Sequence, residues 1–199
     1  MVFRPVATAL LLLLTVAGCA ATSRAPAPSS PQPATRYRVT EADVKFMTAM
    51  IGHHQQALSM AGWAPTHGAS PSIRRLAERI INGQQDEIAS MQQWLRDHGQ
   101  PSHTHHAGHA HAMPGMLTEV QMRQLDQAKG PGFDRLFLTF MIQHHRGAVT
   151  MVKQLFATPG AAQNQTVFKL ANDVSVDQTT EIARMERMLV ALPGAEPAS

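Results

Sequence analysis

The sequence predicts an all-α protein, an antiparallel four-helix bundle built from two duplicated helical hairpins. The first observation is an internal repeat, because the segment Met-Ile-Gly-His-His at 50–54 recurs 91 positions later as Met-Ile-Gln-His-His at 141–145. A second repeat relates residues 76–95 to residues 170–189 with an offset of 94. Apolar residues in these segments follow helical spacing, and no segment alternates as a strand would. The offset is 91 for the first repeat and 94 for the second, so the three inserted or deleted residues lie between the two helices of a hairpin.

The first hairpin is delimited by residues that begin and end helices. A capping box at 40–43, with Asp in place of Glu, opens its first helix, which should end near 65–68. The dipeptide Ser-Pro at 70–71 supplies an N-cap and a first-turn proline for the second helix. Gly99 ends that helix.

The second hairpin follows a loop and a short helix. Residues 99–117 form a His-rich loop, and the short helix is expected over 118–129, broken by Gly-Pro-Gly at 130–132. The first helix of the second hairpin should run from about 133–156, and its partner from about 162–191.

Composition limits the class of function. The chain has 199 residues, enough for one domain with a core, and only 16% are charged. The formal net charge is +3 with no cluster of Lys and Arg, so nucleic acid is not an expected partner. Methionine (12) and histidine (11) are unusually abundant, whereas a single cysteine excludes a disulfide framework within the chain.

The first 18 residues are predicted to be a lipoprotein signal peptide. Arg4 precedes a short apolar run, and the run ends in Val-Ala-Gly-Cys at 16–19, which looks like a bacterial lipobox. Cleavage before Cys19 and acylation of its thiol would anchor the protein to a membrane surface. The expected location is therefore extracytoplasmic, lipid-anchored to the bacterial cell membrane, at the cell surface or in the periplasm. The alternative is an ordinary signal peptide with an incidental cysteine.

A flexible tether is predicted between this anchor and the folded domain. Residues 19–36 are rich in Pro, Ala and Ser, and such a segment cannot bury a core. The helical metal-binding domain is then expected over 37–194.

The repeated segments carry the candidate metal ligands. Six residues offer nitrogen or sulfur donors: Met50, His53, His54, Met141, His144 and His145. In each copy the methionine stands one turn before the two histidines, so thioether and imidazole can converge on one ion. Facing helices would turn both copies toward the same interior. The alternative is that histidines and glutamates hydrogen-bond across the bundle and only hold it together.

The second helix of each hairpin adds further candidates. Glu87 and Glu181 fall level with the histidine pairs, where each could ligate or accept a proton from an imidazole. We favour the hydrogen-bonding role, because soft ions gain less from carboxylates. Met91 and Met185 lie one turn further on, as candidate ligands or as packing residues.

The loop between the hairpins is a second candidate site. It contains five histidines within nine residues: His103, His105, His106, His109 and His111. Tracts of this kind bind metal loosely and reversibly, which suggests a capture site feeding the bundle. A solvated loop without a role is the alternative.

These motifs resemble the bacterial DUF305 family. The matching patterns are Asp-x-x-Phe-Met-x-x-Met-Ile-x-His-His-x-x-Ala at 43–57, Phe-Leu-x-x-Met-Ile-x-His-His-Arg-Gly-Ala at 137–148, and Gln-x-x-Glu-Ile-x-x-Met at 84–91 and 178–185. The resemblance covers about residues 40–192. It implies a ferritin-like four-helix bundle, an extracytoplasmic location and copper binding through Met and His. The His-rich loop is a visible departure from the family pattern.

The expected function is a copper-binding lipoprotein that sequesters or transfers copper in copper homeostasis or tolerance. Met with His favours Cu(I), whereas His alone, as in the loop, suits Cu(II) or Zn(II). A copper-exporting or copper-accepting protein would be the partner. The alternatives are a ferritin-like metal oxidase, or a zinc or nickel buffer that uses the loop. We do not expect an enzyme, because the Glu-x-x-His pairs of di-iron sites are absent from the sequence.

Overall fold

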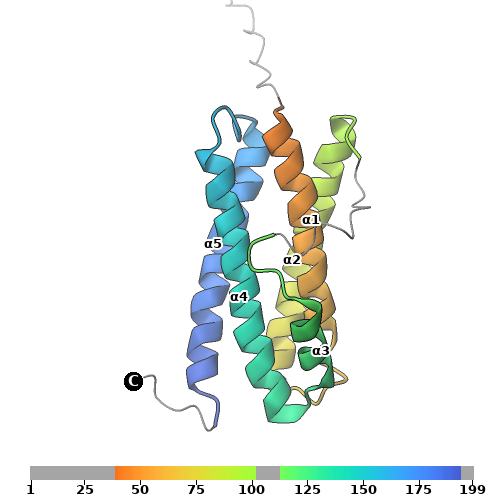
Figure 1. The fold of residues 1–199 in the computed structure, drawn as a ribbon, viewed down its shortest axis with the longest axis vertical. Helices are drawn as coiled ribbons and strands as arrows, with labels where there is room; N and C mark the ends of the chain where they lie inside the picture. Colours follow the sequence, from red (N-terminus) through yellow and green to blue (C-terminus); the bar gives the residue numbers. More distant parts are fainter. Residues whose placement is uncertain (1–38, 102–112, 194–199) are drawn as a thin grey trace, which may run out of the picture. The chain divides into compact units, whose positions relative to one another are not determined.

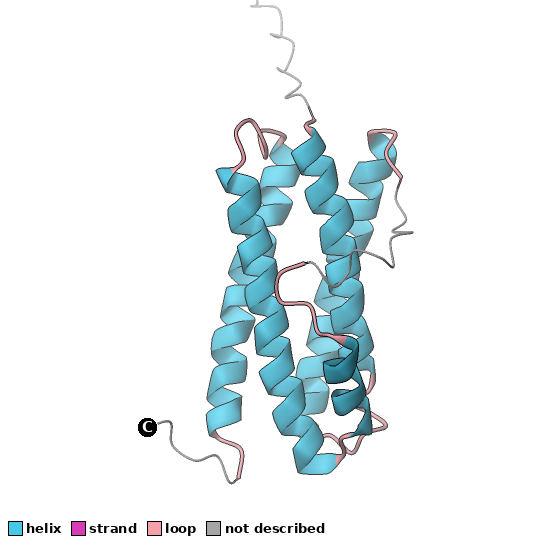
Figure 2. Ribbon diagram, in the orientation of Figure 1, coloured by secondary structure: helices cyan, strands magenta, loops and turns pink. Residues whose placement is uncertain are grey.

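A computed structural model describes residues 39–101 and 113–193. These residues form five helices and no strand (Figure 2). The helices are α1 (Glu41–Gly62), α2 (Pro71–Asp97), α3 (Glu119–Gln127), α4 (Gly130–Ala157) and α5 (Gln165–Val190). The predicted all-α fold is confirmed. Within the described ranges, no helix has the length and apolar character needed to cross a membrane.

The four long helices form two antiparallel pairs (Figure 1). Helix α1 packs along α2, and α4 packs along α5. The pairs meet mainly where α1 contacts α4, whereas α2 and α5 approach each other at fewer positions. The short helix α3 lies against α1 and α4. The long helices therefore follow one another around the bundle in the order α1, α2, α5, α4.

The helix ends follow from local chemistry. The predicted capping box of α1 is present, with Thr40 Oγ1 accepting from the Asp43 amide and Asp43 accepting from the Thr40 amide. Helix α2 has the predicted Ser70 cap. The short helix ends before Gly130, as expected, but α4 begins at Gly130 and not at about 133. A proline in the first turn costs no helical hydrogen bond, so Pro131 is tolerated there.

Two buried aspartates join the hairpins to each other. Asp43 of α1 accepts a 2.7 Å hydrogen bond from the amide of Ala162, just before α5. Its repeat counterpart Asp134 of α4 accepts from the amide of Ser70, at the start of α2, at 3.1 Å. Each hairpin thus caps the turn of the other, which fixes the relative height of α1 and α4.

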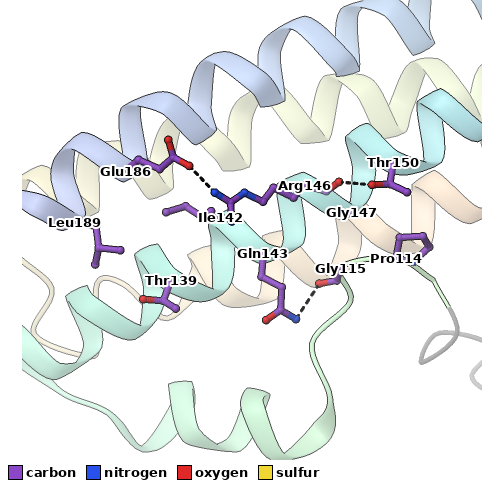
Figure 3. Close-up of a pocket in the computed structure, with 10 residues that line it drawn as sticks. All are labelled: Pro114, Gly115, Thr139, Ile142, Gln143, Arg146, Gly147, Thr150, Glu186 and Leu189. Atoms are coloured by element: carbon purple, nitrogen blue, oxygen red, sulfur yellow. Dashed lines mark hydrogen bonds and ion pairs between the residues drawn. The ribbon is translucent and has the colours of Figure 1, made fainter. Parts of the chain in front are cut away.

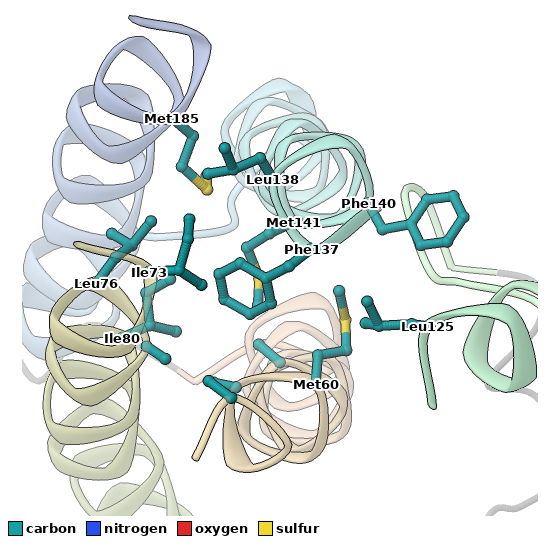
Figure 4. Close-up of a cluster of buried hydrophobic side chains, with 14 of the residues drawn as sticks. Met60, Ile73, Leu76, Ile80, Leu125, Phe137, Leu138, Phe140, Met141 and Met185 are labelled. Carbon is teal, nitrogen blue, oxygen red and sulfur yellow. The ribbon is translucent and has the colours of Figure 1, made fainter. Parts of the chain in front are cut away.

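The apolar core consists of two clusters along the bundle. One contains Met60, Phe137, Met141 and Met185 (Figure 4). The other includes Met50 and Met91 and is a separate group. The two histidine pairs follow Met50 on α1 and Met141 on α4, at mid-length in each helix, so they occupy the level between the clusters.

Candidate metal centre

The four histidines of the repeat form a buried layer between α1 and α4. His53, His54, His144 and His145 all have 0% exposure. The rings of His53 and His144 meet across the helix interface, with centroids 3.9 Å apart and planes tilted by 40°. Successive residues on a helix differ by roughly 100°, so the second histidine of each pair turns toward the other helix of its own hairpin. The structure therefore brings the two predicted pairs together.

The second histidine of each pair, here called the outer histidine, is hydrogen-bonded to a glutamate. His54 Nε2 lies 2.6 Å from Glu87 Oε2, and His145 Nε2 lies 2.7 Å from Glu181 Oε2. With the proton on Nε2, each imidazole donates a hydrogen bond to its carboxylate, which leaves the Nδ1 lone pair free to bind a metal. Both Nδ1 atoms are buried and have no hydrogen-bond partner among the described residues.

The first histidine of each pair, here called the inner histidine, also has a ring nitrogen without a partner among the described residues. His53 Nε2 donates to the carbonyl oxygen of Pro114 at 3.0 Å, and its Nδ1 has no partner in the described chain. His144 has no partner at either nitrogen within the same residues. Burying a polar atom without a hydrogen bond is costly, so four such imidazoles in one layer make it the candidate binding site of the described residues.

Burial also keeps the inner imidazoles neutral. Desolvation, and next the neighbouring His54, lower the pKa of His53 to about 3. Desolvation followed by His53 likewise holds the pKa of His144 well below its usual value. A neutral imidazole is the form that binds a metal, so His53 and His144 are in a ligating state at neutral pH.

The methionines flank the histidine layer on both sides. Met50 and Met91 belong to one apolar cluster, and Met141 and Met185 to the other. All four are buried, with exposures of 0–1%. Met50 and Met141 are therefore not gathered in one pocket. Each stands one helical turn from the histidine pair of its own helix, on opposite sides of the layer.

In the described part of the chain, no three His, Cys, Asp or Glu side chains form a ready-made metal cluster. An ion held here would need thioether sulfur besides imidazole nitrogen, or a small adjustment of the rings. The use of thioether sulfur would favour a soft cation.

The sequence did not reveal a strap that covers the α1–α4 side of the layer. This strap, residues 113–117, places the Pro114 carbonyl on His53. Gln56 fixes it by donating to the Leu117 carbonyl and accepting from the Leu117 amide, at 3.1 and 2.8 Å. Figure 3 shows the strap beside Gly147 of α4.

Only glycine fits where the strap crosses α4. A Cβ on Gly147 would lie 2.0 Å from the Pro114 carbonyl oxygen. A Cβ on Gly115 would lie 2.6 Å from Gly147 Cα, and Gly115 has φ +76°, which side chains rarely adopt. The signal for this contact was the broken repeat, because Gly147 stands where the first copy has Gln56.

Several predicted site residues lie outside the described residues. They are Cys19 and the loop histidines His103, His105, His106, His109 and His111. The lipidation and capture-site predictions therefore stay predictions, as do the boundaries of the leader and the tether.

The fold and this layer define an all-α bundle with a buried centre of imidazoles flanked by thioethers. The sequence model of DUF305, described as a domain of unknown function, matches residues 43–189, and the chain belongs to this family. Among curated proteins, an uncharacterized protein of Acanthamoeba polyphaga mimivirus is 39% identical over 49 residues. That match spans 25% of this chain and 32% of the viral protein.

Solved structures of similar chains include DUF305 proteins from Streptomyces coelicolor and Deinococcus radiodurans. The first has a TM-score of 0.69 at 28% identity, covering 79% of this chain and 98% of that chain. The second has a TM-score of 0.68 at 32% identity, covering 77% and 99%. CopM in its Cu(I)-bound form is also similar, with a TM-score of 0.62 at 29% identity over 76% of this chain and 98% of CopM.

Proposed function

We propose that this protein binds copper in the histidine layer and sequesters it or hands it on outside the cytoplasm. The observation that carries this proposal is the set of buried imidazole nitrogens without partners, flanked by buried methionines. Similar CopM structures contain Cu(I), Cu(II) or Ag, which supports copper and its soft analogue silver as the class of ion.

The inner ligands would be His53 and His144, whose rings already touch. His54 and His145 would add Nδ1, while Glu87 and Glu181 orient them from the other ring nitrogen. Met50 and Met141, with Met91 and Met185 behind them, would supply sulfur from the two sides. This combination of imidazole and thioether favours Cu(I) over Zn(II).

A binding role is better supported than catalysis. A ferritin-like oxidase uses carboxylates as direct ligands in Glu-x-x-His pairs, and the sequence has none. Here the glutamates bind imidazole N–H groups instead.

The proposed location rests on the leader at 1–18 and on Cys19 as an acylation site. An anchored protein would hold copper at the membrane surface, where a copper-exporting or copper-accepting protein could exchange it. The five loop histidines would serve as a weaker Cu(II) or Zn(II) capture site.

The direct test is a Cu(I) competition titration of the purified protein and of a His53→Leu/His144→Leu variant. The matched control is His67→Asn, because His67 is also buried but bonds to Asp126 outside the layer. We expect the double variant to lose affinity by more than about 100-fold and the control to bind like the parent. Equal Cu(I) affinity in the double variant would exclude the layer as the site.

A further inference from the structure

Two phenylalanines are exposed on either side of the turn that joins α4 to α5. Phe156, in the last turn of α4, is 42% exposed, and Phe168, in the first turn of α5, is 53% exposed. Their ring centroids lie 5.5 Å apart, so the two side chains form one small apolar surface. The other phenylalanines of the described residues are at most 8% exposed and belong to the core. This aromatic pair is therefore the exception among them.

The start of α1 lies at the same end of the bundle as the aromatic pair (Figure 1). Asp43, in the first turn of α1, accepts a 2.7 Å hydrogen bond from the amide of Ala162, in the α4–α5 turn. The end of α2 is there too, because Trp94 donates to Asn164, the N-cap residue of α5. The chain that precedes α1 therefore joins the folded domain at the end that carries the aromatic pair.

The preceding chain contains the predicted lipid anchor. Cys19 stands about 20 residues before the first described residue, and such a segment spans roughly 25 Å as a coil and at most roughly 70 Å when extended. The far end of the bundle lies about 40 Å further away, because α4 has 28 residues and a helix rises about 1.5 Å per residue. An acylated Cys19 would therefore hold the aromatic end nearest to the lipid surface.

Charged side chains near the aromatic pair are almost balanced in sign. Lys153 lies one turn before Phe156, and Lys169 follows Phe168 directly; both lysines are exposed, although Lys169 pairs with Asp173. The same end of the bundle has two further exposed cations and two exposed acids: Lys45, Arg96, Glu41 and Asp97. Lysine stems can lie along an apolar surface while their ammonium groups stay among lipid headgroups. Apolar contact, and not net charge, is therefore what this end offers to a partner.

We propose that Phe156 and Phe168 form an interfacial contact through which the bundle rests on the lipid surface that anchors it. The two rings enter the boundary between headgroups and acyl chains, and Lys153 and Lys169 face the headgroups. So small an apolar surface binds weakly by itself, but a short tether keeps it at a high local concentration of membrane. The proposal rests on the anchored location in the proposed function and is independent of copper binding.

The single cysteine of the chain permits a defined test. The mature chain expected after cleavage before Cys19 is coupled through this thiol to a maleimide phospholipid in vesicles of phosphatidylethanolamine and phosphatidylglycerol. This coupling reproduces the length of the tether whether or not cells acylate Cys19. Phe168→Trp then reports on the aromatic pair. Val190→Trp is the matched control, because Val190 is 79% exposed at the other end of the same helix.

Brominated lipids in the vesicles quench tryptophan that enters the membrane boundary. We expect them to reduce the emission of Phe168→Trp by about half and that of Val190→Trp by less than about a tenth, after subtraction of the parent emission from Trp63 and Trp94. Equal quenching of the two reporters, or no quenching of Phe168→Trp, would overturn the proposal. Emission that instead changes with the protein density on the vesicles would assign the pair to a second copy of the chain and would overturn it too.

A second variant tests the contribution of the other ring. Phe156→Ser, added to Phe168→Trp, should reduce the quenching by about twofold, because half of the apolar contact is removed. Phe156 is exposed, so the variant should keep the unfolding temperature of the parent. Unchanged quenching in this variant would contradict a contact made by the pair.

Two further measurements separate this proposal from the proposed function. The mass of the protein isolated from membranes shows whether Cys19 is acylated; an acylated protein without bromolipid quenching would remove only the docking contact. Quenching of the coupled protein with an unmodified Cys19 in cells would remove only the natural anchor. Phe156→Ser/Phe168→Ser should bind Cu(I) like the parent, because neither ring belongs to the histidine layer or its methionine flanks.

Discussion

The imidazole rings of His53 and His144 lie 3.9 Å apart between α1 and α4, without a hydrogen bond joining them. The two residues are repeat counterparts, 91 positions apart in the chain. A pair of neutral rings with free lone pairs at this separation is a place where a cation can be inserted.

The metal-free protein should lose stability as the pH falls below about 6.5. The folded-state pKa values of His53 and His144 are lowered, to about 3 for His53, so the unfolded chain binds protons first. Stability contributed by these groups is present above pH 6.5 and declines by about 1.4 kcal/mol per pH unit for each histidine until the folded-state pKa is reached. Urea unfolding between pH 7.5 and 4.5 measures this slope.

His144→Leu provides the comparison for that slope, because the ring nitrogens of His144 have no hydrogen-bond partner among the described residues. The variant should show a shallower decline than the parent. A parent whose stability is independent of pH over this range would contradict the neutral, buried state of the layer.

Glu87→Gln and Glu181→Gln should each weaken Cu(I) binding by about 10-fold to 100-fold. The carboxylate fixes the ring orientation of its histidine and increases its basicity, and an amide does so less well. Glu186→Gln is the matched control on α5, because Glu186 forms an exposed ion pair with Arg146. Competition titration measures the Cu(I) affinity of all three variants. An equal loss of affinity in Glu186→Gln would show that the effect is not specific to the glutamates that bind the imidazoles.

Gly147→Ala should displace the strap and destabilise the protein by about 1–3 kcal/mol, since the added Cβ overlaps the Pro114 carbonyl. The hydrogen bond from His53 Nε2 to that carbonyl would be lost, so the His53 resonances should change. Gly132→Ala is the control on the same helix, because a Cβ there meets nothing within 4 Å. Its stability should stay the same or rise, and a parent-like Gly147→Ala would refute the close contact.

Ala162→Gly should stabilise the fold by about 0.5 kcal/mol. Ala162 has φ +55°, a left-handed conformation that costs an alanine about 1–2 kcal/mol, and glycine loses part of that gain through the entropy of the unfolded chain. Gly68, in the turn of the first hairpin, also has a left-handed backbone, with φ +67°. Gly68→Ala should therefore destabilise. Thermal or urea unfolding measures the change in stability of both variants, which should be positive for Ala162→Gly and negative for Gly68→Ala. A destabilised Ala162→Gly would mean that the strain is absent.

Much of the histidine layer could be predicted from the sequence, because the repeat fixes it. One offset relates His53 to His144, and a second relates Glu87 to Glu181, so equivalent residues had to lie at equivalent heights in an antiparallel bundle. Helical periodicity predicted which face of each long helix is buried. The glutamate hydrogen bonds follow from the same register.

The strap could not be predicted in this way, since an irregular segment has no periodicity to read. Its position is set by a local departure from the repeat, where Gln56 bonds the strap and its counterpart Gly147 makes room for it. The placement of Met50 and Met141 in separate clusters was also hidden. Because α1 and α4 are antiparallel, Met50 and Met141, each one turn before its histidine pair, lie on opposite sides of the layer and not in one shared space.

X-ray absorption at the copper edge of the Cu(I)-loaded protein tests the central claim most directly. We predict a coordination shell of nitrogen and sulfur, with the sulfur contribution reduced in Met50→Leu/Met141→Leu and the nitrogen contribution reduced in His53→Leu/His144→Leu. A shell of oxygen or nitrogen only, unchanged in both variants, would show that copper does not bind in the buried layer.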